Sequence, residues 1–434
     1  MKLRFCIFST LALCFAARSS AVIIGTNTPS LPLTEARIHA LPLAQRQAWD
    51  NYLQRSIRQR QADKDFFDAE MKAAGVTVAT NAPFGRSFGN IPLNKAGDWY
   101  AGDEARHIAD VIVSFQTPAG GWSKHLNLAG HERVPGERFT SDESSRFLTN
   151  GDLDMPHETN WNYVGTFDND ATTTQLNFLA KVIAALPADA SVKYRTSYLS
   201  GLKYIFSSQY PNGGWPQVWP LEGGYHDAIT FNDDAMVHAL QLLTDIVSGT
   251  NQYAFVPKKM REQAAVSLNR GLQCVLAAQI KVKGQRTVWC QQVDVLTLAP
   301  TSARNYEMPC ESAGESATLM MFLMKIPNPN KEIVAAVNGA GAWFRKTAIY
   351  GYTFKFTSLE GRQLIASPGS GPIWARYYEI GTDRPIFGDR DKTIHDQVRE
   401  ISAERRKGYS WYGDAPKRAL EHYESWSKKT PGPD

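Results

Sequence analysis

The sequence has little cysteine, almost no excess charge and, beyond its first residues, no long hydrophobic run. Five cysteines occur in 434 residues, and 47 Lys and Arg stand against 43 Asp and Glu. The formal charge of +4 excludes binding of nucleic acid or of a membrane surface through net charge. No later stretch reaches the roughly 18 apolar residues of a membrane-spanning helix. Any anionic ligand must therefore meet a local cluster of cations.

The first residues have the pattern of a targeting segment. Lys2 and Arg4 precede an apolar run over residues 5–17, and small residues follow up to Ala21. This order is typical of a secretory signal peptide. We therefore expect residues 1–21 to be removed and the protein to be secreted or periplasmic.

The cysteines that remain after such a cleavage are few. Cys274, Cys290 and Cys310 are an odd number, too sparse for a disulfide scaffold. Cys274 and Cys290 could pair in an oxidising compartment, or all three could be buried free thiols. Neither a CxxC spacing nor a Cys/His ligand set is present, which argues against a structural zinc site.

The chain composition and periodicity predict a folded, mainly α-helical protein. Hydrophobic residues make up 43% and aromatic residues 11%, which excludes general disorder. Few segments alternate like strands. A polar amphipathic helix is expected over residues 43–73. Further helices are expected where apolar positions recur every 3.6 residues, over residues 108–115, 176–183, 198–206, 236–246, 264–278, 317–324 and 333–344.

An internal repeat organises these helices. Gln116 and Gln209 each end a helix and are followed by a turn that closes with Gly-Gly-Trp, at Trp122 and Trp215. A looser copy runs from Gln279 to Trp289. Each unit indicates a helix stopped by Pro and Gly, with a Trp folded back against the next element. Helical hairpins repeated around an axis predict an (α/α) barrel or toroid, with its site at the end where loops and helix N-termini meet.

A second repeat places carboxylates at the end of the barrel where loops and helix N-termini meet. Phe167-Asp168-Asn169-Asp170-Ala171 and Phe231-Asn232-Asp233-Asp234-Ala235 each open a helix. Asp170 and Asp234 occupy the same position, directly before the helix, and are expected to cap it. Asp168 and Asp233 are not needed as caps and can face a ligand. With the neighbouring asparagines, they favour a hard cation such as calcium.

Cationic residues occupy comparable positions. Lys124 follows the first Gly-Gly-Trp turn, where it is either an ordinary solvated cation or a contact for an anionic substrate. Arg304 lies at a helix entrance, and Arg376 and Arg390 lie in a Tyr- and Trp-rich C-terminal segment. Arginine binds carboxylates in a bidentate manner, and aromatic faces stack on sugar rings. A surface network of Arg and Asp would give the same composition.

The motifs resemble the polysaccharide lyase family 10 pectate lyases. The resemblance covers roughly residues 80–412 and is carried by residues 168–174, the Gly-Gly-Trp turns, and residues 302–309, 374–378 and 384–387. It implies an irregular (α/α) barrel of helical hairpins with a central substrate groove. It also implies a catalytic domain over residues 80–434, preceded by an N-terminal extension over residues 22–79. It also implies calcium-assisted β-elimination in α-1,4-linked polygalacturonate.

The resemblance also implies roles for single residues. Arg304 would be the base, and Asp168 and Asp233 would serve the calcium ion. Substrate would bind to Lys124, Asn169, Arg376 and Arg390, and Tyr306 could line a subsite.

The reaction itself sets further expectations. Elimination removes the C5 proton of a galacturonate, and the developing charge needs cations near the carboxylate. Because a guanidinium titrates above pH 12, neighbouring cations must lower the proton affinity of Arg304, and we expect an alkaline optimum. The alternatives are a hydrolase that uses Asp168 and Asp233 as acid and base, and a carbohydrate-binding protein without turnover. We expect a monomer without nucleic-acid or membrane partners.

Overall fold

The computed structural model describes residues 21–85, 91–141, 145, 147–249, 251–357 and 360–430. The expected signal peptide, apart from Ala21, lies outside these residues. The helices follow in the order α1 (Glu35–His39), α2 (Leu43–Ala74), α3 (Asp103–Ser114), α4 (Thr173–Ala185), α5 (Val192–Ser208), α6 (Ala235–Ser248), α7 (Lys258–Ala278), α8 (Ala313–Met324), α9 (Lys331–Thr347), α10 (Ala403–Gly408) and α11 (Ala415–Lys429). Within the described part, no helix is both long and apolar enough to cross a bilayer.

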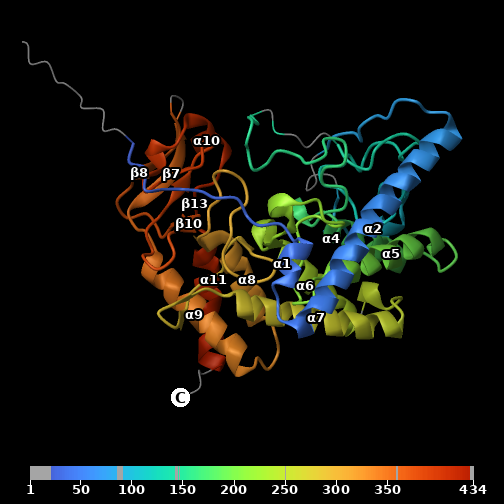
Figure 1. Cartoon of the computed structure of the whole chain (residues 1–434). Coiled ribbons are helices and arrows are strands. Elements are labelled where there is room, and N and C mark those ends of the chain that lie inside the picture. Colours follow the sequence, from blue (N-terminus) through green and yellow to red (C-terminus); the bar gives the residue numbers. More distant parts are fainter. Residues whose placement is uncertain are drawn as a thin grey trace, which may run out of the picture.

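Two rows of helices pack against each other and form an (α/α) toroid, as the sequence predicted (Figure 1). Helices α3, α5, α7 and α9 contact one another in turn and make one row. Helices α4, α6, α8 and α11 make the other. The apolar faces of both rows meet in one hydrophobic core. Every helix expected from the 3.6-residue period is present, because the apolar residues that form its buried face are close together in the sequence.

The Gln and Trp repeat fixes neighbouring hairpins to one another. Nε2 of Gln116, at the end of α3, donates to Gly120 O and to Ser197 O of α5, at 2.7 and 2.9 Å. Gln209 and Gln279 make the same pair of bonds to the next helices of the row. Trp122 Nε1 donates back to Ile112 O of α3, while its ring reaches α5. The same bond to the preceding helix recurs at Trp215, Trp289 and Trp374.

The strands are short and lie mostly in the C-terminal part of the chain. The six-residue hairpin β7 (Tyr352–Thr357) and β8 (Gly361–Ala366) is the longest pairing in the described part. The remaining strands are β1 (Gly25–Thr26), β2 (Ile229–Thr230), β3 (Lys281–Val282), β4 (Gln285–Arg286), β5 (Gln292–Val293), β6 (Glu311–Ser312), β9 (Trp374–Ala375), β10 (Tyr377–Tyr378), β11 (Phe387–Gly388), β12 (Thr393–His395) and β13 (Tyr412–Gly413).

Residues 22–79 pack onto the same core as the toroid. The long helix α2 crosses the molecule (Figure 1), and its Tyr52 OH donates to Ser208 O at the end of α5, at 2.8 Å. Before α2, β1 pairs with β12 in an antiparallel, three-stranded sheet of order β1-β12-β11. The N-terminal residues therefore lie beside a C-terminal segment rather than apart from the domain.

Candidate active site

Two matching loops open the helices α4 and α6. We call residues 167–171 the first aspartate loop and residues 231–235 the second. Each contains a single 3-10 turn, η2 (Asp168–Asp170) or η4 (Asn232–Asp234). Asn169 has φ 49° and ψ 44°, and Asp233 at the same position has φ 49° and ψ 35°. Asn and Asp tolerate this left-handed conformation better than other side chains, which explains why the repeat uses them.

The carboxylate of the first loop is held in its charged state. Asp168 is buried, and its Oδ2 accepts from Lys124 Nζ at 2.6 Å. Its Oδ1 accepts from Gln217 Nε2 at 2.9 Å. Burial alone would raise the pKa of Asp168, but Lys124 outweighs burial and lowers the pKa to about 2. Lys124 also lies over the ring of Tyr163, 3.5 Å from its centroid. Lys124 is therefore a buried contact rather than a solvated surface cation.

The carboxylate of the second loop is in the opposite situation. Asp233 Oδ2 accepts hydrogen bonds from two amides, Asn232 Nδ2 at 3.1 Å and Asn169 Nδ2 at 3.3 Å. Burial and the negative charge of Asp168 raise the pKa of Asp233 to about 7. The two loops thus bring together a carboxylate that is held charged, Asp168, and a carboxylate whose ionisation is disfavoured by its neighbour, Asp233.

The prediction that Asp170 and Asp234 cap helices α4 and α6 is wrong. The N-cap positions of α4 and α6 are Thr172 and Asp234, and neither side chain makes a capping hydrogen bond. Asp170 instead meets His238 Nδ1 of α6 at 2.5 Å. Burial and the charge of Glu315 raise the pKa of Asp234 to about 6. The left-handed backbone of these loops turns both carboxylates away from the free N–H groups and toward tertiary partners.

The third element is a tight turn that we call the arginine turn, residues 303–307. Arg304 Nε donates to Glu307 Oε2 at 2.8 Å, and Nη2 donates to Oε1 at 2.5 Å. Tyr409 OH donates to the same carboxylate at 2.6 Å. Burial lowers the pKa of Arg304, but Glu307 outweighs burial and raises the pKa well above its usual value. The expectation that neighbouring cations lower the proton affinity of Arg304 is therefore wrong.

These three elements line one cavity of about 370 Å³. It joins five of the residues predicted from the sequence, Lys124, Asp168, Asn169, Asp233 and Arg304. Other members of its wall were not predicted from the sequence, among them Asp154, Tyr163, Gln217, Tyr225, Gln292, Glu307 and Tyr409. Glu307 is three residues from Arg304, so its spacing could have indicated an ion pair.

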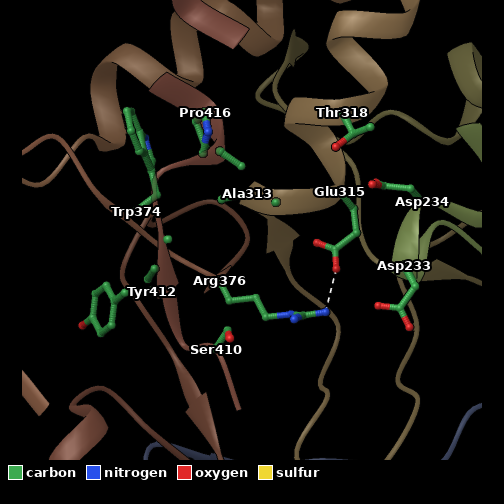
Figure 2. Close-up of a pocket in the computed structure, with 14 residues that line it drawn as sticks. Asp233, Asp234, Ala313, Glu315, Thr318, Trp374, Arg376, Ser410, Tyr412 and Pro416 are labelled. Carbon is green, nitrogen blue, oxygen red and sulfur yellow. Dashed lines mark hydrogen bonds and ion pairs between the residues drawn. The ribbon is translucent and has the colours of Figure 1, made fainter. Parts of the chain in front are cut away.

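The three other predicted substrate residues do not line this cavity. Tyr306 is 3% exposed and lies beneath Arg304, whose guanidinium carbon is 5.0 Å from the ring centroid. Arg390 Nε donates to Glu404 Oε2 at 2.9 Å. Arg376 faces a second cavity of about 300 Å³, shown in Figure 2. Its Nη2 donates to Glu315 Oε1 at 2.7 Å and to Asn232 Oδ1 at 3.1 Å. Because Asp233 lines both cavities, Arg376 lies next to the first one.

The oxygen atoms at this site fit a cation for which the protein supplies only some of the ligands. Among the described residues, no group of three His, Cys, Asp or Glu is arranged as a metal site. Asp168 and Asp233 provide two carboxylates, and burial and the charge of Asp168 raise the pKa of Asp233 although Arg376 and Arg304 act in the opposite direction. A hard cation with oxygen ligands relieves such repulsion and takes further ligands from water or substrate. The three cysteines after residue 21 are buried free thiols.

The comparisons with known proteins point to one group. A family model described as pectic acid lyase matches residues 116–420. The family 10 polysaccharide lyase from Cellvibrio cellulosa is 29% identical, with a TM-score of 0.64 over 79% of this chain and 99% of that one. An Asp-to-Ala mutant of that lyase in complex with trigalacturonic acid is 30% identical, with a TM-score of 0.63 over 77% of this chain and 98% of that one. No curated protein matches the chain.

Proposed function

This chain belongs to the pectic acid lyase family and is a pectate lyase, and from that premise we propose that it cleaves polygalacturonate by calcium-assisted β-elimination with Arg304 as the base. The observation that carries the proposal is the convergence of Arg304, Lys124 and the two aspartate loops on one cavity. The trigalacturonic acid bound to the similar lyase supports an acidic sugar as the ligand.

The cavity offers cations to the uronate carboxylate. Removal of the C5 proton places a second negative charge beside a carboxylate that already carries one, and this charge is the main barrier. Lys124 lines the cavity and carries a positive charge that Asp168 neutralises only in part, whereas Arg304 has to be neutral when it accepts the C5 proton. A calcium ion held by Asp168 and Asp233 would supply the remaining positive charge at the uronate.

The hydrogen bonds of Arg304 indicate which nitrogen faces the substrate. Glu307 holds Nε and Nη2, and Nη1 has no hydrogen-bond partner in the described part of the chain. The side chain is 31% exposed, so its outer edge reaches the cavity. We assign Nη1 to the C5 proton. Tyr409 and Glu307 orient the guanidinium, and the oxygen that leaves C4 takes its proton from solvent.

The pH dependence follows from the raised pKa of Arg304. Glu307 stabilises the protonated guanidinium, so the fraction that can accept a proton is small and grows as the pH rises. The rate should therefore increase from pH 7 into the alkaline range. A measured profile that peaks near pH 6 would assign the proton to another base.

The test combines product, metal and base. Purified protein with polygalacturonate should release an unsaturated product that absorbs in the near ultraviolet, and a chelator should stop its release until calcium is returned. Arg304→Lys should lose most turnover while it still binds oligogalacturonate. A product without the double bond would support the hydrolase alternative, binding without any product would support the non-catalytic one, and normal turnover of Arg304→Lys would remove Arg304 from the mechanism.

Export of the protein is part of the same proposal. Residues 1–21 should direct the chain out of the cytoplasm and be cleaved. Sequencing the N-terminus of the protein recovered outside the cytoplasm tests this, and a chain that still begins at Met1 would contradict it.

A further inference from the structure

The chain that precedes the matched family region lies against the active site. We call residues 22–33 the N-terminal strap. Its strand β1 pairs with β12, with Gly25 opposite Ile394. Ile24 N donates to Ile394 O at 2.8 Å, and Asn27 N donates to Lys392 O at 2.7 Å. In Figure 1 this segment follows the C-terminal β-rich part before it turns to α1. The backbone of Asn27 is therefore fixed by the sheet.

The side chain of Asn27 reaches the arginine turn. It is 3% exposed, and its Nδ2 lies within hydrogen-bonding distance of three carbonyl oxygens, those of Arg304 at 3.0 Å, Asn305 at 3.1 Å and Glu307 at 3.2 Å. Its Oδ1 accepts from Thr28 N at 3.0 Å, which fixes the orientation of the amide. The two N–H groups of this amide thus join three backbone carbonyls of one turn.

These carbonyls belong to the backbone that sets the guanidinium. Within the turn, Glu307 N donates to Arg304 O at 2.9 Å, and Ala303 N donates to Glu307 O at 3.0 Å. The side chain of Asn305 adds two links, accepting from Leu153 N at 2.9 Å and donating to the carbonyl of Arg390 at 2.5 Å. Asn27 is the contact that the strap adds at the centre of the turn. A shift of the turn would move Arg304 and its partner Glu307 together.

We propose that Asn27 is a positioning residue for Arg304, so that the N-terminal strap is a working part of the active site. The inference rests on the proposed role of Arg304 as the base. The amide acts through the backbone of the arginine turn and does not touch the substrate. Its contribution should appear in the chemical step rather than in binding, because misplacement of a reacting group by about 1 Å costs on the order of 100-fold in rate.

The substitutions Asn27→Ala and Asn27→Asp test this role. The first removes the donor, and the second replaces it with an oxygen that faces three carbonyl oxygens. Both should lower kcat by about 10- to 100-fold. KM should change by less than about threefold, since the groups that bind the uronate remain in place.

Thr34→Ala is the matched control. Thr34 caps α1 just beyond the strap by accepting from Arg37 N at 3.3 Å, and it lies outside the active site. This variant should lose stability but keep the kcat of the wild type. An equal kcat for Asn27→Ala and Thr34→Ala, measured well below both melting temperatures, would overturn the proposal.

A double-mutant cycle separates positioning from general structural damage. If Asn27 acts through Arg304, Asn27→Ala should not lower further the residual rate of Arg304→Lys, measured at high enzyme concentration. The same fold-loss in both backgrounds would show a role independent of Arg304 and overturn the inference. If Asn27→Asp does not fold, Asn27→Ala alone decides. A wild type without unsaturated product would instead refute the proposed function.

Discussion

The two aspartate loops have the same backbone and opposite electrostatics. Asn169 and Asp233 share left-handed φ and ψ values within 9° of each other. Asp168, one position earlier, faces Lys124 and is held charged, whereas Asp233 faces Asp168 and resists ionisation. A repeated fold element thus sets where a carboxylate can lie, and the order of Asp and Asn within it decides which charge the carboxylate meets.

The strongest way to break the comparison is to make the loops identical. Asp168→Asn with Asn169→Asp gives the first loop the sequence of the second. The backbone should persist, because both residues tolerate the left-handed region. Lys124 loses its carboxylate, and the new carboxylate faces Asp233 where Asn169 donated at 3.3 Å. Turnover on polygalacturonate should fall by about 1,000-fold or more. Unchanged circular dichroism would show that the fold survives, and near-normal turnover would contradict the assigned roles.

Removing the cation tests the first loop by itself. Lys124→Met leaves the buried Asp168 carboxylate with Gln217 as its one side-chain donor among the residues that the structure describes. Loss of one partner of a buried pair costs about 3 kcal/mol. Urea unfolding measures this loss. Lys193→Met, which breaks the exposed ion pair with Asp110, is the control and should cost less than about 1 kcal/mol. Equal losses in the two variants would mean that burial of the pair contributes nothing.

A carboxylate outside the site shows what burial does without a charged neighbour. Asp63 of α2 is fully buried; it accepts from Gln59 Nε2 at 2.7 Å, and burial raises its pKa from 3.8 to about 6. The folded state therefore favours the protonated form, and the free energy of unfolding should fall by about 3 kcal/mol as the pH rises from about 4 through 6. Unfolding measured against pH should show this slope in the wild type and in Asp65→Asn, but not in Asp63→Asn. A slope retained in Asp63→Asn would assign it to other groups.

The smallest expected effect has the opposite sign. Asp233→Asn removes the repulsion from Asp168 and should stabilise the calcium-free protein at pH 8 by about 1 kcal/mol, while it abolishes the response of turnover to calcium. Thermal unfolding in the presence of a chelator measures the gain, with exposed Asp189→Asn as the control. A destabilised Asp233→Asn protein would show that Asp168 and Asp233 do not repel each other.

The sequence predicted the hairpins well because their signals are local. The 3.6-residue period and the Gln to Gly-Gly-Trp turns each lie within a few residues of the structure that they determine. The fourth Trp bond, from Trp374 to Phe344 O, could not be predicted from the repeat because no Gly-Gly pair precedes Trp374. Helix α11 and the alternating hairpin β7–β8 were missed although their patterns were present.

The site was harder to predict because its partners are tertiary. Asp170 bonds to His238 rather than to its own helix, and Glu307 reverses the expected effect on Arg304. The residues were selected by type and position, but charge state depends on the neighbours that folding brings within a few ångströms. The exclusion of Tyr306 from the cavity wall is of the same kind.

The link from Asn27 to Arg304 spans 277 residues of sequence, and β1 finds its partner strand still later in the chain. Contacts of such long range form late in folding, because the entropy cost of closing a large loop must be met before these contacts stabilise the protein. The helical hairpins can assemble one after another as the polypeptide emerges, whereas the arginine is locked in place only when both distant segments have met. Catalysis should therefore begin only when folding is complete, and a nascent lyase should stay inactive until its C-terminal segments have been synthesised and have paired with the N-terminal strap.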